Sequence, residues 1–522
     1  MKRIIDSKRR GVTGVVLVGA LLLLAPGLAR AESKPVQAPA IAGVASLPGP
    51  IAPAAKPAAD MQVLKTTPDT GVAGQTMTIG AAGLQPNKTV SIVWMTANVS
   101  WTLDARPDSI DYTGRKVDKF GVVLATPSTD SNGSFVTQIK VPTDFGGIHD
   151  VFAVADGLQV SKGGFLIERK MSITPTRGPI GTPITVHFTG LSYALYDSGG
   201  AIYYDNKYIG AFTANTTRGS GAFVIRAAGP IGKHQVVSGP AITVDYLNAP
   251  QSPQPWQPMF NMSFTVTKDA GPPKAYVDWP NKVTPTVGPT TTLTTAGLNS
   301  ASGATATLSA TSGTVLTKVS LTAGGLTPNA PVDVAFSTVV GNRVNCTGTC
   351  WALSQVPVGS TTASATGSVS TKITIPDGLG GWHVIQLLQN GVAKAQVPFF
   401  VDRSLVSLPR QVKAGDRFTI HLKGVGWTQL DNTAAVTYDN SFVGYGCGFN
   451  SNGDVVLNLV ASGEPGTHLI DLYPMLYTQN PVYLNAAEVY GMVPFLTYAQ
   501  DAPGLALGYQ LPAMRLAITV VK

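Results

Sequence analysis

The chain has 522 residues, of which 56 are glycine, 38 are proline and 13% are charged, and its formal net charge is +8. Hydrophobic residues make up 44% of the chain, which excludes disorder throughout, and glycine has no period of three, which excludes collagen. At about 100–200 residues per domain the length predicts three to five domains, and the low charge favours an exported all-β protein.

Residues 1–31 are predicted to be a secretory signal peptide. Five basic residues lie between Lys2 and Arg10, an apolar stretch runs from Val12 to Leu28, and Ala29-Arg30-Ala31 offers a cleavage site. The alternative is an uncleaved membrane anchor, but Pro26 makes the apolar run shorter than the ~20 residues that a spanning helix needs. We therefore expect a protein that is secreted, displayed on the cell surface or periplasmic, with no spanning segment after cleavage. Arg9-Arg10 leaves twin-arginine export open beside the general secretory route.

Cleavage changes the charge of the chain. The leader holds six Lys/Arg and one Asp, so the remaining chain has 31 basic and 28 acidic residues and a net charge of +3. Binding of nucleic acid needs a basic stripe, and the sequence contains none. Residues 32–60 are rich in proline and alanine, which predicts an extended spacer.

The rest of the chain reads as a duplication. All six histidines form pairs with one constant spacing along the sequence: His149/His383, His187/His421 and His234/His468. The Tyr-Asp-Asn sequences at 204–206 and 438–440 keep the same spacing. Farther upstream the spacing between matching segments is longer, so the first copy carries a net insertion between about Trp94 and Pro142.

Each copy divides again, because Gly-x-His followed by alternating apolar residues occurs four times. Short strands at this spacing are typical of sandwiches of about 100 residues. The sequence predicts an all-β fold of four tandem immunoglobulin-like β-sandwiches arranged as two duplicated pairs. The expected units are 61–169, 170–268, 304–402 and 403–522, with a linker at 269–303 in which Trp279 docks onto a neighbouring unit.

The pattern resembles bacterial extracellular immunoglobulin-like repeats, including those of the IPT/TIG type. The shared elements are an early strand that ends in glycine, a predicted D-x-N-G-x-F hairpin at Asp130–Phe135, and the late Gly-x-His strand. The histidine and the long tail of the last unit depart from that pattern. The resemblance implies a structural or adhesive role on the cell surface and transfers no catalytic residue.

The histidines are predicted to be structural. His187 and His421 alternate with apolar neighbours, so they belong to the polar face of their strands. In the late strands we expect the ring to cover the end of the core and one nitrogen to bond a backbone carbonyl, as a tyrosine does at sandwich corners. Asp205-Asn206 and Asp439-Asn440 are interpreted as tight hairpin turns, with a polar ligand site beside Tyr204 and Tyr438 as the alternative.

The three cysteines all lie in the second copy. Cys346 and Cys350 are predicted to form a local disulfide, since export permits oxidation. Cys447 is then left over, although pairing of Cys447 with either of the other two is a second arrangement that the sequence leaves open.

Aromatic residues in loops are the best candidates for binding. Trp94, Trp101, Trp256 and Trp351 could hold a sugar ring or a protein partner on an exposed face, and the alternative is packing between units. Residues 474–508, rich in tyrosine, proline and leucine, form a candidate surface for self-association or docking.

No catalytic, cofactor or metal motif occurs in the sequence, which lacks G-x-S-x-G, a Walker loop, a dinucleotide fingerprint and H-E-x-x-H. We expect an exported, non-enzymatic structural or adhesive protein, with no cofactor and no metal, that binds a protein or polysaccharide at the cell envelope through loops of its units. The alternatives are a carbohydrate-binding accessory protein that uses the loop tryptophans, and an exported enzyme with a site between units.

Overall fold

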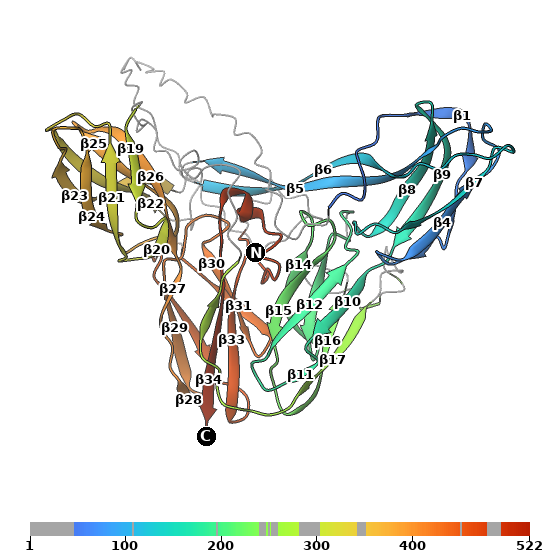
Figure 1. The fold of residues 1–522 in the computed structure, drawn as a ribbon. Coiled ribbons are helices and arrows are strands. Elements are labelled where there is room, and N and C mark those ends of the chain that lie inside the picture. Colours follow the sequence, from blue (N-terminus) through green and yellow to red (C-terminus); the bar gives the residue numbers. More distant parts are fainter. Residues whose placement is uncertain are drawn as a thin grey trace, which may run out of the picture. The chain divides into compact units, whose positions relative to one another are not determined.

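The computed structural model describes residues 46–522 apart from 107–108, 195–196, 240–246, 249–250, 252–258, 281–302, 342–350, 449–450 and 478–491. All described residues belong to one unit of the chain, Pro35–Lys522. Their regular structure consists of strands β1 to β34 and the short 3-10 helix η4 (Pro503–Leu507), so the predicted all-β class is confirmed (Figure 1). The predicted signal peptide lies outside the described residues.

The strands form pairs of sheets, one with three strands and one with five or six. In the 56–167 sheet pair the small sheet is β2-β4-β7 and the large sheet is β1-β9-β8-β5-β6, with β3 beside β9. The bounds are β1 (Lys56–Val63), β2 (Lys65–Thr67), β3 (Thr70–Gly71), β4 (Thr76–Ala81), β5 (Ser91–Arg106), β6 (Ser109–Ala125), β7 (Phe135–Lys140), β8 (Gly147–Ala155) and β9 (Leu158–Ile167).

The 170–266 sheet pair has the same strand order. Its small sheet is β10-β12-β15 and its large sheet is β11-β17-β16-β13-β14. The bounds are β10 (Lys170–Thr174), β11 (Arg177–Gly178), β12 (Pro183–Thr189), β13 (Gly199–Tyr204), β14 (Lys207–Thr213), β15 (Gly221–Arg226), β16 (Gly232–Gly239) and β17 (Phe260–Val266).

The 305–402 sheet pair repeats that order, with β19-β21-β24 as the small sheet and β20-β26-β25-β22-β23 as the large one. The bounds are β19 (Thr305–Leu308), β20 (Ser312–Thr314), β21 (Lys318–Gly324), β22 (Pro331–Gly341), β23 (Trp351–Thr362), β24 (Val369–Thr374), β25 (Gly381–Gln389) and β26 (Val392–Asp402).

The 404–521 sheet pair consists of β27-β29-β32 and β18-β34-β33-β30-β31, with β28 beside β34. The bounds are β18 (Tyr276–Asp278), β27 (Ser404–Ser407), β28 (Gln411–Lys413), β29 (Arg417–Lys423), β30 (Thr433–Tyr438), β31 (Ser441–Cys447), β32 (Val455–Val460), β33 (Gly466–Pro474) and β34 (Ala513–Val521). In every pair a short early strand runs parallel to the last strand, and all other pairings within these sheets, apart from β1 with β9, are antiparallel. The described part is thus a series of tandem immunoglobulin-like sandwiches.

Period-two alternation explains how these strands pack. In β12, Ile184, Val186 and Phe188 are buried between the two sheets, whereas His187 between them is exposed. The equivalent His421 in β29 also alternates with buried apolar residues. The predicted orientation of both histidines on the polar face is therefore confirmed.

Two kinds of turn connect the strands. Asp205-Asn206 and Asp439-Asn440 have φ of 50°, 63°, 46° and 60°, so both are tight turns with two left-handed residues, and the predicted hairpins β13–β14 and β30–β31 are confirmed. Asn132-Gly133 also forms a turn, but the strands on either side of it, β6 and β7, belong to different sheets. The interpretation of that turn as a hairpin was wrong, because a tight turn does not specify that its flanking strands pair.

The expected spacer and linker both contribute strands. β1 begins at Lys56, inside the proline- and alanine-rich segment, and pairs in parallel with β9. Within the expected linker, β18 adds to the edge of β34, because Tyr276 and Val277 lie opposite Arg515 and Met514. Trp279, expected to dock this linker, is 47% exposed. Backbone pairing rather than an aromatic anchor holds this segment.

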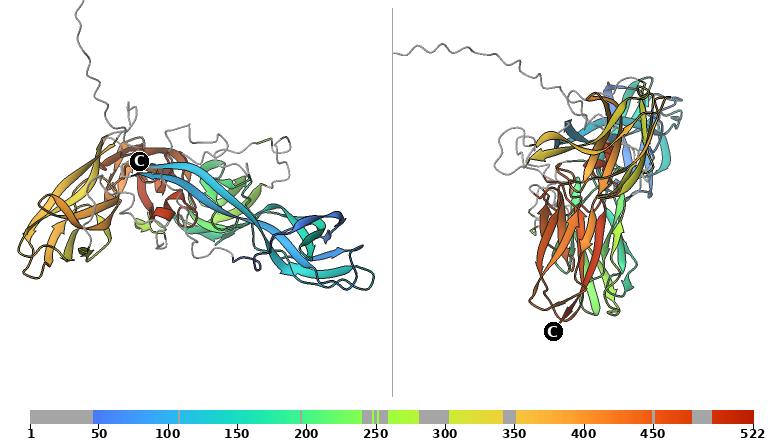
Figure 2. Two further views of the ribbon diagram at one scale, coloured as in Figure 1. Left: turned by 90° about the horizontal axis from the view of Figure 1, so that it is seen from above. Right: turned by 90° about the vertical axis from the view of Figure 1, so that its left-hand side faces the viewer.

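The insertion in the first copy lengthens one hairpin. β5 and β6 have 16 and 17 residues, against 11 and 12 in the equivalent β22 and β23. Figures 1 and 2 show β5 and β6 as a long two-stranded ribbon. Its far end carries Trp101 and Tyr112, which join an apolar cluster together with residues of the 170–266 and 404–521 sheet pairs.

Candidate functional site

The predicted binding tryptophans are inside the protein. Trp94 is 0% exposed, stacks on His149 with ring centroids 4.3 Å apart, and donates from Nε1 to Asp144. Trp351 is 4% exposed and packs with Trp427. Neither side chain presents the open face that ring stacking requires, so their interpretation as a binding platform is corrected. Trp256 lies outside the described residues.

Trp101 is also fully buried, but it serves a contact between distant parts of the chain. Its Nε1 donates to Oδ1 of Asp501 at 2.9 Å, across 400 residues of sequence. Packing between units, which was the alternative for these aromatics, accounts for Trp101. The aromatic residue types were read from the sequence, but their burial depends on which elements meet.

Asp501 accepts hydrogen bonds from several parts of the chain, a role that the sequence did not reveal. Its carboxylate is 0% exposed and accepts from Trp101, from Oγ1 of Thr213 at 2.6 Å, from the amide of Asn215 at 2.7 Å, and from the amide and hydroxyl of Thr216 at 3.0 and 2.8 Å. These donors come from the long hairpin, from the end of β14 and from the segment that follows β14. A single carboxylate thus joins three parts of the chain.

The segment 474–508 faces inward where it is described. Met475, Phe495, Leu496 and Tyr498 are each no more than 6% exposed, and η4 is buried throughout. The segment packs against β14, since the amide of Ala211 donates to Pro494. The expected self-association surface is therefore corrected in this part: it docks onto the same chain.

Cys447 is a free, half-buried thiol, and burial raises its pKa to about 11. The alternative arrangement in which Cys447 pairs with another cysteine is thereby ruled out in this structure. The predicted disulfide between Cys346 and Cys350 falls on residues outside the described ones and stays a prediction.

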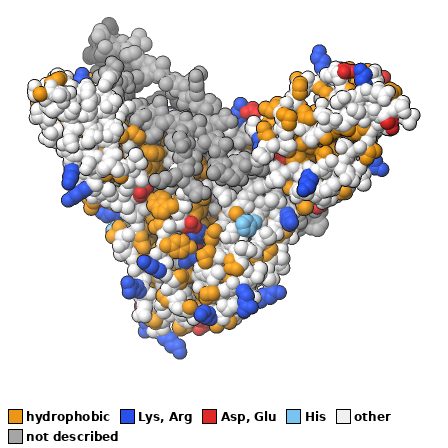
Figure 3. Space-filling model, viewed as in Figure 1, with side chains coloured by type: hydrophobic (Ala, Val, Ile, Leu, Met, Phe, Trp, Pro, Cys, Tyr) orange, Lys and Arg blue, Asp and Glu red, His pale blue; other side chains and the backbone are white. Residues whose placement is uncertain are grey.

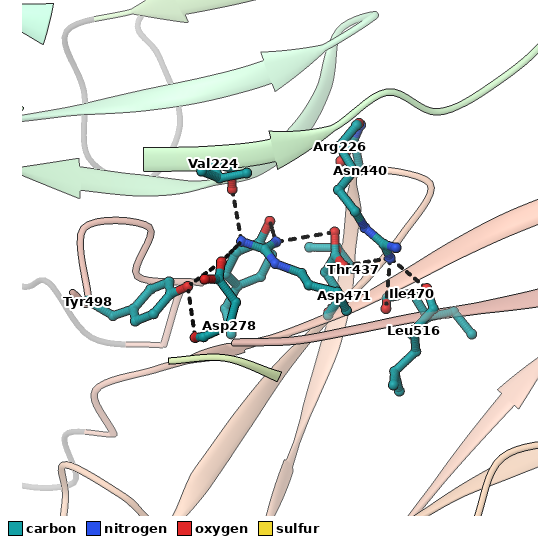
Figure 4. A network of polar contacts seen from close by, with 11 residues as sticks. Val224, Arg226, Asp278, Thr437, Asn440, Ile470, Asp471, Tyr498 and Leu516 are labelled. Atoms are coloured by element: carbon teal, nitrogen blue, oxygen red, sulfur yellow. Dashed lines mark hydrogen bonds and ion pairs between the residues drawn. The ribbon is translucent and has the colours of Figure 1, made fainter. Parts of the chain in front are cut away.

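The strongest candidate site is a buried ion network between the 170–266 and 404–521 sheet pairs (Figure 4). Its first member is Arg226, the last residue of β15, whose guanidinium is fully buried. Nη2 of Arg226 lies 2.6 Å from Oδ1 of Asp471 and donates to the carbonyls of Leu516 at 2.5 Å and Ile470 at 3.2 Å. One side chain of the earlier sheet pair therefore bonds two strands of the later one, β33 and β34.

Arg515 on β34 completes the network from the opposite side. It lies 3.4 Å from Oδ2 of Asp471 and 3.1 Å from Oδ2 of Asp278, and it donates to the carbonyl of Val224 on β15 at 3.0 Å. Asp471 is thus held between two arginines, and Asp278 comes from β18, the strand within the expected linker.

Two tyrosines close the network. Arg515 donates to the hydroxyl of Tyr473 at 2.7 Å and lies 4.8 Å from the centroid of its ring. Tyr498 donates to Oδ2 of Asp278 at 3.0 Å. Burial, partly offset by Arg515, raises the pKa of Tyr473 to about 12, and burial raises the pKa of Tyr498 as well. Both hydroxyls therefore stay protonated at neutral pH and act as hydrogen-bond partners only.

The interactions at this site fasten two sheet pairs to each other. Arg226 and Arg515 balance the charges of Asp278 and Asp471, so the network needs no ligand to become neutral. Desolvating four charges is costly, which makes such a network a poor source of raw stability, but its geometry specifies which surfaces meet. In the described part of the chain no cluster of three His, Cys, Asp or Glu side chains could hold a metal ion.

The four Gly-x-His motifs share one contact. Nε2 of His149, His234, His383 and His468 bonds the carbonyl four residues earlier in the chain, at 2.7 to 3.0 Å. The predicted bond from ring nitrogen to backbone carbonyl is confirmed. Burial lowers the pKa of His383 to about 4.

In two of these motifs the other ring nitrogen meets the hairpin aspartate. His234 Nδ1 lies 2.5 Å from Asp205, and His468 Nδ1 lies 2.6 Å from Asp439. The hydrogen bond to Asp439 raises the pKa of His468 above its usual value. Tyr204, suspected of flanking a ligand site, is 1% exposed and donates to the carbonyl of Ala228. These residues brace the turn and the core.

Comparisons with known proteins found similar solved structures but no related sequence. No protein family and no curated protein matches its sequence. Among solved structures it is similar to a Salmonella alpha-2-macroglobulin reacted with methylamine, at 8% identity and a TM-score of 0.17 over 88% of this chain and 31% of that one. It is also similar to an Escherichia coli alpha-2-macroglobulin activated by porcine elastase, at 9% identity and a TM-score of 0.14 over 79% of this chain and 42% of that one.

A third similar structure is the ICAM-5 D1–D4 ectodomain fragment, at 10% identity and a TM-score of 0.17 over 88% of this chain and 100% of that one. The chain spans less than half the length of either macroglobulin. Within the described residues, no helix has the length and apolar character that a membrane crossing requires.

Proposed function

We propose that the protein is an exported, non-enzymatic structural or adhesive protein of the cell surface or extracellular space, built from four immunoglobulin-like sandwiches that arose as a duplicated pair. It presents a binding surface on sandwiches that are docked against each other, and it holds a protein partner. The observation that carries this proposal is the ion network of Arg226, Asp471, Arg515 and Asp278, which ties together sheet pairs that are far apart in the sequence.

Contacts that recur at the constant spacing of the histidine pairs support the duplication. Arg169 donates from Nη2 to the carbonyls of Asp197 and Gly199, and Arg403 donates from Nη2 to those of Asp431 and Thr433. Both arginines are buried just before the first strand of a sheet pair. The same side chain thus fastens the same loop in both halves.

A stiff scaffold is what a surface protein that must present a site requires. Flexible linkers are the default between domains, and a buried interface removes that freedom. Here the links are buried side chains: Arg226 on one side, and Asp501, which accepts from Trp101 and Thr213, on another. The burial of Trp94, Trp101 and Trp351 leaves the carbohydrate-binding alternative with Trp256 alone among the predicted platforms.

Cell fractionation of the full-length chain with a C-terminal tag tests this proposal. We expect the processed chain, beginning after residue 31, in the envelope or the medium, and cross-linking in intact cells should join it to an envelope protein. Recovery of unprocessed chain in the cytoplasm would contradict export. An enzymatic activity that copurifies with the processed protein, and that is lost on mutation of Asp471 or Tyr473, would contradict the non-enzymatic role.

A further inference from the structure

Two edge strands occupy the same place in two large sheets, yet within the described residues only one of them is covered. β14 lies beside β13 and β31 lies beside β30, and each pair is joined by an Asp-Asn turn. The registers agree as well, because Ala201 faces Ala211 and Ala435 faces Tyr445, and each pair has its bulge at the same position. Ala211 and Tyr445 are therefore equivalent edge residues.

The outer edge of β14 is paired with an extended segment from the same chain. The amide of Ala211 donates to the carbonyl of Pro494 at 2.9 Å, and the amide of Leu496 donates to the carbonyl of Ala211 at 2.8 Å. The residue between them, Phe495, forms a parallel bridge with Ala211 and is 4% exposed. The backbone comes so close that a Cβ added at Gly210 would lie 2.5 Å from the carbonyl oxygen of Pro494.

The outer edge of β31 carries no such segment among the described residues. Tyr445 is 43% exposed where Ala211 is 0% exposed, and Val443 is 51% exposed where its equivalent Ile209 is fully buried. No backbone hydrogen bond within the described ranges reaches the outer side of Tyr445. An open strand edge with apolar side chains is a template for another strand.

A groove runs along this edge between β31 and the neighbouring edge strand β32. It has a volume of about 500 Å³. Its lining includes Val443, Tyr445, Cys447, Val455, Leu457 and Leu459. Val456 and Val460 on β32 are 52% and 49% exposed. Figure 3 shows hydrophobic side chains gathered on this face of the molecule, near the place where Figure 1 labels β31.

We propose that β31 is a docking edge that accepts an extended segment of a partner protein with the pattern proline–aromatic–aliphatic, added parallel to the strand. The covered edge specifies this chemistry. At the first position only a backbone carbonyl is used, and proline can supply it. At the third position a backbone amide hydrogen is needed, as Leu496 supplies on β14. The aromatic residue between these two positions is buried. Main-chain bonds supply affinity and the side chains supply selectivity.

This inference names the partner class for the proposed adhesive function and rests on it for its biological meaning. The binding itself can be tested apart from export, because it is a property of the purified chain. Failure of the peptide to bind would remove the docking edge and leave cell-surface export untouched, whereas failure of export would leave the peptide binding intact.

The probe is a dye-labelled peptide with the sequence Met492–Tyr498 (MVPFLTY), the segment that already covers β14. Its binding to purified residues 32–522 is measured by fluorescence anisotropy. We expect saturable binding that weakens at least about fivefold when the third residue of the motif, leucine, is N-methylated, since one backbone hydrogen bond is lost. Val443→Asp should abolish binding, whereas Val136→Asp, on the exposed and unrelated strand β7, should leave it unchanged.

Hydrogen exchange locates the bound peptide. In the free chain the amide of Tyr445 should exchange rapidly and that of Ala211 slowly; the peptide should protect Tyr445 and leave Ala211 unchanged. Three results would overturn the proposal: no saturable binding, binding that survives Val443→Asp, or a Tyr445 amide already protected in the free chain. If the Tyr445 amide is already protected and the chain is monomeric, a segment of the same chain covers the edge. If the protection rises with protein concentration, a second copy of the chain covers it.

Discussion

Replacing Arg226 by methionine removes the guanidinium from the ion network and keeps an apolar stem of similar length. The substitution deletes the contacts of Arg226 with Asp471, Leu516 and Ile470. It leaves Asp471, which is 2% exposed, with Arg515 as its remaining charged partner at 3.4 Å. The buried charge of Asp471 is then less well compensated, and this should weaken the contact between the two sheet pairs.

The magnitude follows from the burial. Removing one partner of a buried ion pair costs about 3–5 kcal/mol, because the other charge stays desolvated. Since Asp471 keeps its second arginine, we expect a loss near the lower end, about 3 kcal/mol. Most of it should appear as undocking of the 170–266 and 404–521 sheet pairs, because β12 and β29 bury their apolar faces within their own pairs.

Urea unfolding followed by tryptophan fluorescence and circular dichroism measures this effect. Trp101 lies at the contact and should report undocking, while circular dichroism should report loss of the strands. We expect the two curves to separate in Arg226→Met, with the fluorescence change first. The matched control is Lys88→Met, which breaks the exposed ion pair with Asp156 and should cost no more than about 1 kcal/mol.

Coincident curves in Arg226→Met, or a loss no larger than that of Lys88→Met, would refute this reasoning. Either result would mean that the network does not hold the two sheet pairs together. A double-mutant cycle of Arg226→Met with Asp471→Asn separates the pair from its surroundings, and it should give a favourable coupling between these two residues.

Three further predictions concern single side chains. Asp501→Asn should destabilise the chain by about 3 kcal/mol, as charged hydrogen bonds are lost, and a melting temperature within error of wild type would contradict this. Burial lowers the pKa of His383 to about 4, so its contribution to the free energy of unfolding should be complete above pH 6.5, the ordinary pKa of histidine, and should be lost as the pH falls toward 4. An NMR titration midpoint near 6.5 would be inconsistent with that burial. The hydrogen bond to Asp439 raises the pKa of His468, so its contribution to the free energy of unfolding should be complete below pH 6.5 and should be lost as the pH rises through the raised pKa. Asp439→Asn should return the NMR titration midpoint of His468 toward 6.5. An unchanged midpoint would argue against the pair.

The strands and tight turns could be predicted from the sequence because they depend on local chemistry. Alternation placed His187 and His421 on the polar face of their strands, and Asp-Asn steps indicated turns with positive φ. The Gly-x-His pattern indicated a ring bound to a backbone carbonyl, since the ring lies at the end of a strand whose neighbours are buried. In each case the interaction forms within one sandwich.

The candidate site could not be predicted, because it depends on where separate sandwiches meet. Arg226 and Arg515 have no special sequence context, and Arg226 lies far from its partner Asp471 in the sequence. Trp101 looked like an exposed loop residue, but the long hairpin carries it to Asp501. The sequence did carry a signal for a different contact: Arg169 and Arg403 keep the same spacing as the histidine pairs, and arginines kept at such a spacing point to a shared structural contact.

The docking of the 170–266 and 404–521 sheet pairs is tested most directly by a distance measurement between them. Spin labels at Ile231→Cys and Val406→Cys, which replace side chains that are 67% and 50% exposed in the two pairs, are read by double electron–electron resonance with Cys346, Cys350 and Cys447 changed to serine. We expect one narrow distance distribution in the wild-type network and a broader one in Arg226→Met. A broad distribution in the intact network would contradict a locked pair of sandwiches.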